Sequence, residues 1–193
     1  MGNPAAATII LIGCSAGGVE ALKLVLGELS RDFPAAIVIV QHIAVNSGDT
    51  LAQLLDDMCD IQVKEAEENE IIQAGIVYLA PANYHLMIEP DRTFALSIDP
   101  PVSYARPSID VLFESAALLT GVQLIGVILT GANADGSTGL KKISEAGGVT
   151  IVQDPASARA ANMPEAALQA VHADHIVALE NLSALLIQLV HNG

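Results

Sequence analysis

The feature that most constrains this chain is a glycine-rich turn, GCSAGG at 13–18, placed between an apolar run and a helical pattern. The run before it, Thr8–Ile12, is typical of a buried strand, and Gly18–Leu29 carries apolar residues at helical spacing. A strand that turns sharply into a helix brings the free N–H groups and positive end of that helix to the turn. Ser15 lies in this turn in the pattern G-x-S-x-G, which exposes its hydroxyl. Such a turn suits a phosphate or the oxyanion of an acyl-transfer intermediate.

Apolar runs alternate with helical patterns along most of the chain. Four runs are continuously apolar, as in strands buried on both faces of a parallel sheet, namely Thr8–Ile12, Ala35–Val40, Leu124–Leu129 and Val149–Val152. Later helices are predicted at Ser47–Met58 (with Ser47 as N-cap), Pro107–Leu119, Ser137–Ala146, Pro164–Val171 and Leu182–Val190, and a last short strand at His175–Ala178. This alternation predicts an α/β fold with three layers, α/β/α, around a doubly wound, mostly parallel sheet.

The middle of the chain departs from this alternation. Short strands are predicted at Ile76–Ala80, His85–Glu89 and Thr93–Ile98, which together indicate a small antiparallel ribbon. Just before them, residues 56–70 carry seven acidic residues and one lysine, which indicates a solvated surface segment. Residues 1–6 are predicted to form a flexible tail, and the length of 193 residues fits one domain, 1–193.

Composition excludes several classes of function. The net charge of −14, from 22 acidic and 8 basic residues, argues against binding to nucleic acid or to an anionic membrane surface. No apolar run approaches the ~18 residues of a membrane span, and we find no secretory signal. Two cysteines, Cys14 and Cys59, do not make a disulfide framework, so a cytoplasmic location is expected. No cluster of residues has metal-ligand spacing, and we expect neither a metal nor a cofactor.

Polar side chains follow three of the predicted strands at the point where each strand ends. Ser15 follows the first strand, His42 the second, and Asp135 the strand Leu124–Leu129. Because sites in doubly wound sheets form at the carboxyl ends of the strands, these side chains are expected to converge. The histidine then removes the serine proton, and the carboxylate fixes the imidazole tautomer. Asp135 can alternatively serve as an N-cap of the following helix, which does not exclude catalysis.

Two other interpretations of the first turn fit the residues less well. A dinucleotide-binding module needs G-x-G-x-x-G and an acid at the end of the second strand, but Ser15 replaces the second glycine and Gln41-His42 ends that strand. An ordinary α/β-hydrolase carries serine, acid and histidine in that order, whereas His42 precedes Asp135. The residues therefore favour triad chemistry on a different fold.

Several segments, taken in order, resemble the catalytic domain of the chemotaxis protein-glutamate methylesterases, the CheB family. The resemblance extends from Ile12 to about Ala167, through IGCSAGGVEA (12–21), VQH (40–42), APANYH (80–85), RPSIDVLF (106–113), GVILTG (126–131), DG (135–136), QDPASA (153–158) and MP (163–164). It implies hydrolysis of γ-glutamyl methyl esters on cytoplasmic chemoreceptor helices, often with deamidation of receptor glutamines. It also implies the triad Ser15, His42 and Asp135, which agrees with the strand ends.

Further roles complete this interpretation. The backbone N–H groups of Ala16 and Ala132 are expected to form the oxyanion hole. Arg106 and Arg159 lie in loops beside strand ends and are expected to orient substrate, although a structural role for them is equally open. His85 is expected to be structural. Full-length family members usually carry an N-terminal receiver domain, which we do not find in this sequence. We therefore expect either a stand-alone esterase or an excised domain, and a receiver domain on another chain is a candidate partner.

Two other functional classes stay open. The turn before the acid is GANADG (131–136), where family members usually resemble G-[MT]-G-x-D-G. This departure is compatible with a non-catalytic signalling scaffold of the same fold. The chain can also be a general serine esterase acting on small esters.

Overall fold

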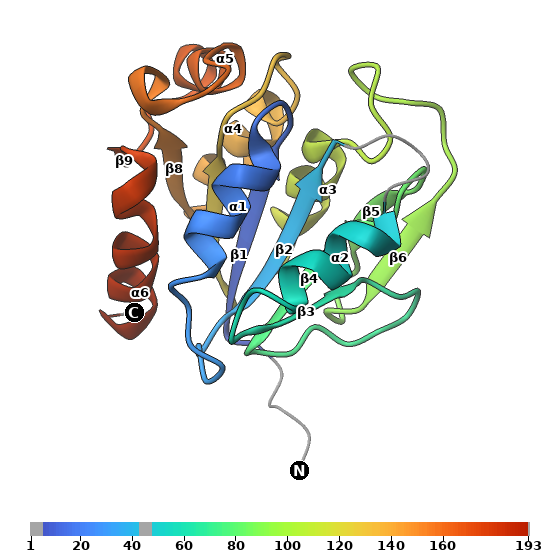
Figure 1. Cartoon of the computed structure of the whole chain (residues 1–193). Helices are drawn as coiled ribbons and strands as arrows, with labels where there is room; N and C mark the ends of the chain where they lie inside the picture. The colour runs from blue at the N-terminus through green and yellow to red at the C-terminus, as the bar shows by residue number, and fades with distance from the viewer. Residues whose placement is uncertain (1–5, 43–47, 193) are drawn as a thin grey trace.

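A parallel sheet of seven strands, in the order β3-β4-β2-β1-β7-β8-β9, forms the centre of the molecule (Figure 1). The computed structural model describes residues 6–42 and 48–192. The strands of the sheet are β1 (Thr8–Cys14), β2 (Ala36–Gln41), β3 (Gln62–Glu65), β4 (Ile76–Leu79), β7 (Gln123–Ile128), β8 (Val149–Gln153) and β9 (His175–Val177). A separate antiparallel pair consists of β5 (His85–Ile88) and β6 (Phe94–Ser97).

Helices cover both faces of the sheet, which gives the three layers (Figure 1). They are α1 (Gly18–Leu26), α2 (Gly48–Asp56), α3 (Ile109–Ala116), α4 (Ser137–Glu145), α5 (Asn162–Ala170) and α6 (Leu182–Asn192), with short 3-10 turns η1 (Pro155–Ser157) and η2 (Leu179–Asn181). Alternate residues of β1 face opposite layers, as the pleat of a strand requires. Ile10 and Ile12 pack with α1, α2 and α6, whereas Ile9 and Leu11 pack with α3, α4 and α5. The predicted doubly wound α/β fold is confirmed.

The order of the strands brings three of their ends together. β1 lies between β2 and β7, and the register aligns Gly13 with Val40 on one side and with Ile128 on the other. After β1 the chain forms β2, β3 and β4 on one side of β1, and it later forms β7, β8 and β9 on the other side. The carboxyl ends of these strands therefore surround a topological switch point, where ligands bind in open α/β sheets.

Two predictions for the middle of the chain are wrong in detail. The strand at 76–80 does not belong to the antiparallel ribbon, because β4 pairs in parallel with β2 and β3 inside the main sheet. All four residues of β4 are buried, in keeping with an apolar sequence that does not alternate. The acidic segment 56–70, predicted to be solvated surface only, contains the edge strand β3, in which Val63 is the buried residue. Charged residues are common on such edges because they oppose pairing with another chain.

The chain termini and helix starts add smaller corrections. Ala6, predicted to belong to the flexible tail, is buried, and its N–H donates to the carbonyl of Ile72 at 3.3 Å. Residues 1–5 and the predicted N-cap Ser47 lie outside the described residues. Helix α3 begins at Ile109 with Ser108 as N-cap, two residues later than predicted. Within the described ranges, no helix combines the length and apolarity that a bilayer crossing requires.

Candidate active site

Ser15 directly follows β1, and both neighbouring strands hold its backbone. Its N–H donates to the carbonyl of Thr130, after β7, at 2.9 Å, and its own carbonyl accepts from the N–H of Gly18 at 2.8 Å. Gly17, at φ 82°, has the left-handed backbone conformation that glycine adopts readily, and it turns the chain into α1. The side chain of Ser15 makes no hydrogen bond to any described residue. We call residues 15–18 the nucleophile turn.

Gln41, the last residue of β2, connects this turn to His42. Its buried Nε2 donates to the carbonyl of Ser15 at 3.0 Å and to the carbonyl of His42 at 2.8 Å. Its Oε1 accepts from the thiol of Cys14 at 3.1 Å, and a Cβ added to Gly18 would collide with the same oxygen. The sequence analysis assigned no role to Gln41. The available signal was an amide at the last position of an otherwise apolar strand.

His42 contacts the buried carboxylate of Asp135. The two atoms joined are Nε2 and Oδ2, at 2.9 Å, and Asp135 is 0% exposed. This contact favours the tautomer with the proton on Nε2, which leaves Nδ1 of His42 free to accept a proton. No hydrogen bond joins Ser15 to His42 among the described residues, although both side chains line one pocket. The structure thus brings the three predicted residues to one sheet edge and forms one of the two triad contacts.

Three consecutive residues at the start of α3 surround the carboxylate of Asp135, and we call them the carboxylate cradle. Oδ1 accepts from the hydroxyl of Ser108 at 2.8 Å and from the N–H of Asp110 at 3.1 Å. Oδ2 accepts from the N–H of Ile109 at 2.7 Å. Burial favours the neutral acid, but the hydrogen bonds from His42 and the cradle outweigh burial and hold the pKa of Asp135 below its usual value. The lowered pKa of Asp135 therefore favours the ionised carboxylate beside His42.

The N-cap alternative for Asp135 is corrected by the same contacts. Asp135 accepts from the first turn of α3, whereas α4, the helix that follows it, has Gly136 at its N-cap and no side-chain cap. In return, Oδ1 of Asp110 accepts from the N–H of Gly139 in α4 at 2.7 Å. The carboxylate that precedes α4 thus binds the first turn of α3, and a carboxylate of α3 binds the first turn of α4. Burial, followed by the nearby charge of Asp135, raises the pKa of Asp110 to about 6, although the bond from Gly139 opposes this.

The cradle is the part of the site that sequence reasoning missed. RPSID (106–110) entered only as a motif of the resemblance, and Pro107 was taken as the start of the helix. A serine followed two residues later by an aspartate at a helix start is a typical capping signal, but it does not reveal a carboxylate from residue 135. His85, expected to be structural, supports the cradle, since its Nδ1 accepts from the N–H of Ser108 at 3.2 Å and its Nε2 donates to the carbonyl of Pro100 at 3.1 Å.

The two predicted oxyanion-hole residues, Ala16 and Ala132, are both exposed at this edge. Neither backbone N–H donates to an acceptor among the described residues. Thr130 orients the first of them, because its hydroxyl donates to the carbonyl of Ala16 at 2.8 Å. Asn133, at the position of a family glycine, does not have a positive φ. Its Oδ1 accepts from the N–H of Asp135 at 3.2 Å. The backbone therefore does not require glycine there.

The two predicted substrate-binding arginines have different surroundings. The guanidinium of Arg106 is engaged, since it donates to Oδ1 of Asn83 at 2.7 Å and to the carbonyls of Ile98 at 2.7 Å and Asp99 at 3.0 Å. Arg159 is exposed beside the nucleophile turn, and its nearest carboxylate is Glu20 at 3.8 Å. Such a long, exposed ion pair contributes little, so the Arg159 guanidinium is available to a ligand.

A pocket of about 320 Å³ occupies this edge of the sheet, lined by Ser15, His42, Tyr104, Ala105, Arg106, Pro107 and Asn133. Cys14 lies behind it as the buried residue expected, and burial raises the pKa of its thiol, so it stays protonated. Among residues 6–42 and 48–192, no group of three or more His, Cys, Asp or Glu residues is placed to hold a metal ion.

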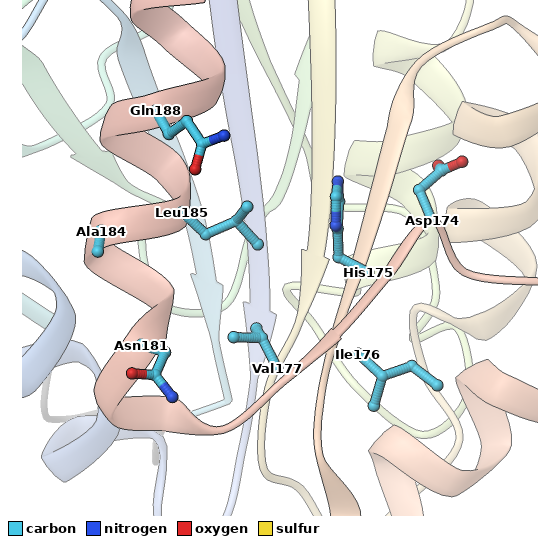
Figure 2. Close-up of a pocket in the computed structure, with 8 residues that line it drawn as sticks. All are labelled: Asp174, His175, Ile176, Val177, Asn181, Ala184, Leu185 and Gln188. Carbon is cyan, nitrogen blue, oxygen red and sulfur yellow. The ribbon is translucent and has the colours of Figure 1, made fainter.

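A second pocket, of about 490 Å³, lies at the other end of the sheet between β9 and α6. Figure 2 shows Val177 and Leu185 projecting into the space between that strand and that helix. Its one carboxylate, Asp174, already accepts from the N–H and the hydroxyl of Thr150, both at 2.8 Å. None of the predicted site residues lines it, so the 320 Å³ pocket is the candidate active site.

Known proteins were compared with the chain and its fold. The model of the family described as CheB methylesterase matches residues 10–186. A putative protein-glutamate methylesterase/protein-glutamine glutaminase of Leptospira interrogans is 51% identical over 184 residues, which cover 95% of each chain. The protein-glutamate methylesterase/protein-glutamine glutaminase of Halalkalibacterium halodurans is 40% identical over 176 residues, 90% of this chain but 51% of that protein. The crystal structure of the Thermotoga maritima CheB methylesterase catalytic domain superposes with a TM-score of 0.91, at 33% identity, over 95% of this chain and 99% of that one.

Proposed function

The chain belongs to the CheB methylesterase family, and we propose that it hydrolyses methyl esters on the glutamate side chains of chemoreceptors. The curated relatives are named for this esterase activity together with a protein-glutamine glutaminase activity. Deamidation of receptor glutamines is therefore part of the proposal, since both reactions are acyl transfers from a γ-glutamyl group to water. We also propose a cytoplasmic location for this reaction.

The observation that carries the mechanism is the contact of His42 with the buried carboxylate of Asp135, in one pocket with a Ser15 hydroxyl that bonds to none of the described residues. In the proposed reaction, Nδ1 of His42 takes the proton of Ser15 while Oγ attacks the ester carbonyl. The tetrahedral intermediate collapses, methanol leaves with that proton, and an acyl-enzyme remains on Ser15. Water then attacks the acyl-enzyme with His42 again as the base, which releases the glutamate carboxylate and restores Ser15.

We propose that the N–H groups of Ala16 and Ala132 bind the oxyanion of both intermediates. Two features support this, their position at the ends of β1 and β7 and the absence of an acceptor for either group in the described chain. Preorganised donors of this kind lower the barrier because they need no reorganisation when the charge develops. No metal or cofactor enters any step.

For the substrate, we propose that Arg159 orients receptor carboxylates and that Arg106 acts by holding the wall of the pocket. The contacts of Arg106 to Asn83, Ile98 and Asp99 support its indirect role. A receiver domain on another chain remains our candidate regulatory partner.

The two alternative functions are less consistent with these contacts. A non-catalytic scaffold has no need for a buried carboxylate that accepts four hydrogen bonds, in contact with a histidine that shares a pocket with a serine. A general small-ester esterase fits the same chemistry, so only the substrate separates it from the proposal.

The test is mass spectrometry of a methylated receptor fragment, run in parallel with a small chromogenic ester. We expect each esterified glutamate of the fragment to lose one CH₂ in mass, EDTA to have no effect, and a serine-directed organophosphonate to block the reaction. Hydrolysis of the small ester alone supports the general esterase, and no reaction with either substrate supports the scaffold. Loss of activity on chelation, restored by zinc, contradicts the triad.

A further inference from the structure

The loop between β6 and α3 carries an unusual tyrosine. Val102 and Ala105 exchange backbone hydrogen bonds, N–H of Ala105 to Val102 at 2.9 Å and N–H of Val102 to Ala105 at 3.1 Å. The two residues between them have φ values of 51° at Ser103 and 63° at Tyr104. This is the geometry of a two-residue hairpin of type I′, which strongly prefers asparagine or glycine at these positions. A bulky residue such as tyrosine destabilises this backbone conformation.

No contact within residues 6–42 and 48–192 explains why tyrosine occupies this position. Tyr104 is fully exposed, at 105% relative accessibility, whereas four of the six aromatic residues of the chain, Phe33, Tyr78, Phe94 and Phe113, are at most 2% exposed. The other exposed aromatic residue is Tyr84, at 41%. A large side chain that destabilises its backbone conformation and stays fully exposed to solvent beside the described part of the chain indicates a role in binding another molecule.

The tyrosine lies at the mouth of the candidate active site. Tyr104 lines the 320 Å³ pocket together with Ser15 and His42. In Figure 1 the hairpin belongs to the loop that rises from β6 beyond the carboxyl ends of the strands and returns to α3. Any macromolecule that presents a side chain to Ser15 therefore passes close to Tyr104.

Three more exposed apolar side chains occupy the segments that surround this hairpin. Ile98 is 74% exposed, Tyr84 is 41% exposed and Val102 is 39% exposed. Arg106 connects these segments, because its guanidinium binds the carbonyl of Ile98 and the side chain of Asn83, the neighbour of Tyr84. We call Tyr84, Ile98, Val102 and Tyr104 the apolar rim.

The charge of the molecule favours an apolar contact over an ionic one. The chain has 22 acidic and 8 basic residues, and a receptor helix becomes more negative with every ester that is cleaved. Attraction between net charges therefore cannot hold such a substrate, and long-range repulsion slows its approach. Tyrosine is enriched among residues that dominate binding energy because its large rigid ring buries much apolar area at a small entropic cost.

We propose that Tyr104, supported by the apolar rim, binds the aliphatic side chains that lie one helical turn from the esterified glutamate of the receptor helix. On a helix, residues three or four positions apart share one face, so a glutamate in the pocket presents such neighbours to the rim. The inference rests on the proposed function and names the residue that distinguishes a helical protein substrate from a small ester.

The test compares Tyr104→Asn with the wild type on a methylated receptor fragment and on a small glutamyl methyl ester. Asparagine tolerates the left-handed backbone, so this variant removes the ring and keeps the turn. We expect kcat/KM on the receptor fragment to fall about tenfold more than kcat/KM on the small ester, with a melting temperature no lower than that of the wild type. Tyr104→Phe, which keeps the ring, is expected to recover most of the receptor rate.

Leu118→Asn is the matched control, because Leu118 is 78% exposed and lies just after the C-terminal end of α3, away from the pocket. We expect wild-type rates on both substrates from this variant. Equal losses on both substrates for Tyr104→Asn, or no loss on either, would overturn the inference. So would a Tyr104→Phe variant as slow as Tyr104→Asn, since the contact then belongs to the hydroxyl.

A binding measurement separates this inference from the proposed function. The receptor fragment is titrated onto Ser15→Ala, with and without Tyr104→Asn, so that no turnover is required. Weaker binding by about tenfold in the double variant supports the contact even when the wild type hydrolyses neither ester. Equal affinities of the two proteins contradict it, whatever the enzymatic activity.

Discussion

Two helix N-termini meet at the candidate site and are used in opposite ways. The start of α3 is occupied, since the carboxylate of Asp135 accepts from the N–H groups of Ile109 and Asp110 and from the hydroxyl of Ser108. The start of α1 has no side-chain cap, and the nucleophile turn before it leaves the N–H of Ala16 without an acceptor in the described chain. Both ends carry the same partial positive charge.

The difference follows from when the negative charge is present. In the proposed mechanism Asp135 is charged throughout the reaction, and its donors are already bonded in the resting protein, where they lower the pKa of the carboxyl. The proposed oxyanion exists only during the reaction, so donors for it must be unoccupied before the substrate arrives. A triad of this kind thus requires two different helix starts. At the acid end, the start of α3, the donors are bonded, whereas at the nucleophile end, the start of α1, a donor is left without an acceptor.

Ser15→Ala tests the nucleophile end and should have the largest effect. We expect ester hydrolysis to fall on the order of 10⁴- to 10⁶-fold, because no other group forms the acyl-enzyme. Adding His42→Ala should lower the rate little further, since triad members act as a unit. Single-turnover rates on a methylated receptor fragment measure both effects. A Ser15→Ala variant that keeps most of the wild-type rate would show that another nucleophile acts.

Asp135→Asn tests the acid end. We expect kcat to fall about 10⁴-fold, since an amide facing Nε2 of His42 favours the wrong tautomer. The protein should fold with a lower melting temperature, because an amide N–H₂ in the carboxylate cradle faces other donors. Kinetics and thermal unfolding check the two effects. Ser108→Ala, which removes one donor, is the graded control, and a larger loss of kcat from it than from Asp135→Asn contradicts the comparison.

Gln41→Met tests the connection between the two ends. The substitution keeps the shape of the side chain but removes both donors to the carbonyls of Ser15 and His42. We expect kcat to fall about 10- to 100-fold with little change in KM, since small displacements of reacting groups are costly. Gln123→Met is the matched control, because Gln123 begins β7, away from the pocket, and its side chain accepts from the hydroxyl of Thr8. Equal kcat for the two variants would remove the positioning role.

Asp110→Asn tests how the two buried carboxylates share charge. The folded pKa of Asp110 is raised to about 6, so the folded protein keeps this proton while the unfolded chain loses it near pH 4. Its ionisation therefore lowers stability as pH rises from about 4 to about 6, by an amount on the order of 2 kcal/mol. The lowered pKa of Asp135 has the opposite effect. It contributes stability that is fully present above the ordinary pKa of an aspartate and is lost as the pH falls through the lowered pKa of the folded state.

We expect Asp110→Asn to abolish that decrease, since asparagine still accepts from the N–H of Gly139 and carries no charge. Urea unfolding at about pH 4.5 and about pH 7.5 measures it. The same loss of stability between the two pH values in the variant and in the wild type would assign the effect to another group.

Ionic strength gives the smallest effect and tests the surface around both ends. With a net charge of −14, we expect kcat/KM on an intact receptor fragment to rise about two- to threefold between about 20 and about 150 mM salt, with little change on a neutral small ester. If the exposed Arg159 dominates locally, salt lowers the rate instead, and Arg159→Ala removes the dependence. A salt-independent receptor rate would show that neither field guides encounter.

Much of this architecture was predictable from local pattern. The continuous apolar runs that became β1, β2, β7 and β8 are buried on both faces, and that requirement is visible in sequence because each position must be apolar. The alternation of these runs with helices determined the layers. The positions of Ser15, His42 and Asp135 at strand ends also followed, because parallel strands place all carboxyl ends at one edge.

The details that complete the site depend on contacts between distant parts of the chain. Nothing near residue 135 indicates that its acceptor atoms face the first turn of α3, and nothing near Gln41 indicates that its amide spans two carbonyls. The prediction for β4 was wrong for the same reason, since its pairing with β2 and β3 depends on how the whole sheet assembles.

The amino-acid sequence alone determined the class of fold, the edge at which the candidate site forms and the three polar residues that meet there, since each depends on local periodicity and on strand ends. Tertiary structure alone decided which helix start is occupied by a carboxylate, which arginine keeps an exposed guanidinium and which tyrosine faces solvent at the mouth of the pocket. These depend on hydrogen-bond partners up to dozens of residues apart and on the surface left exposed after packing, and local sequence specifies neither.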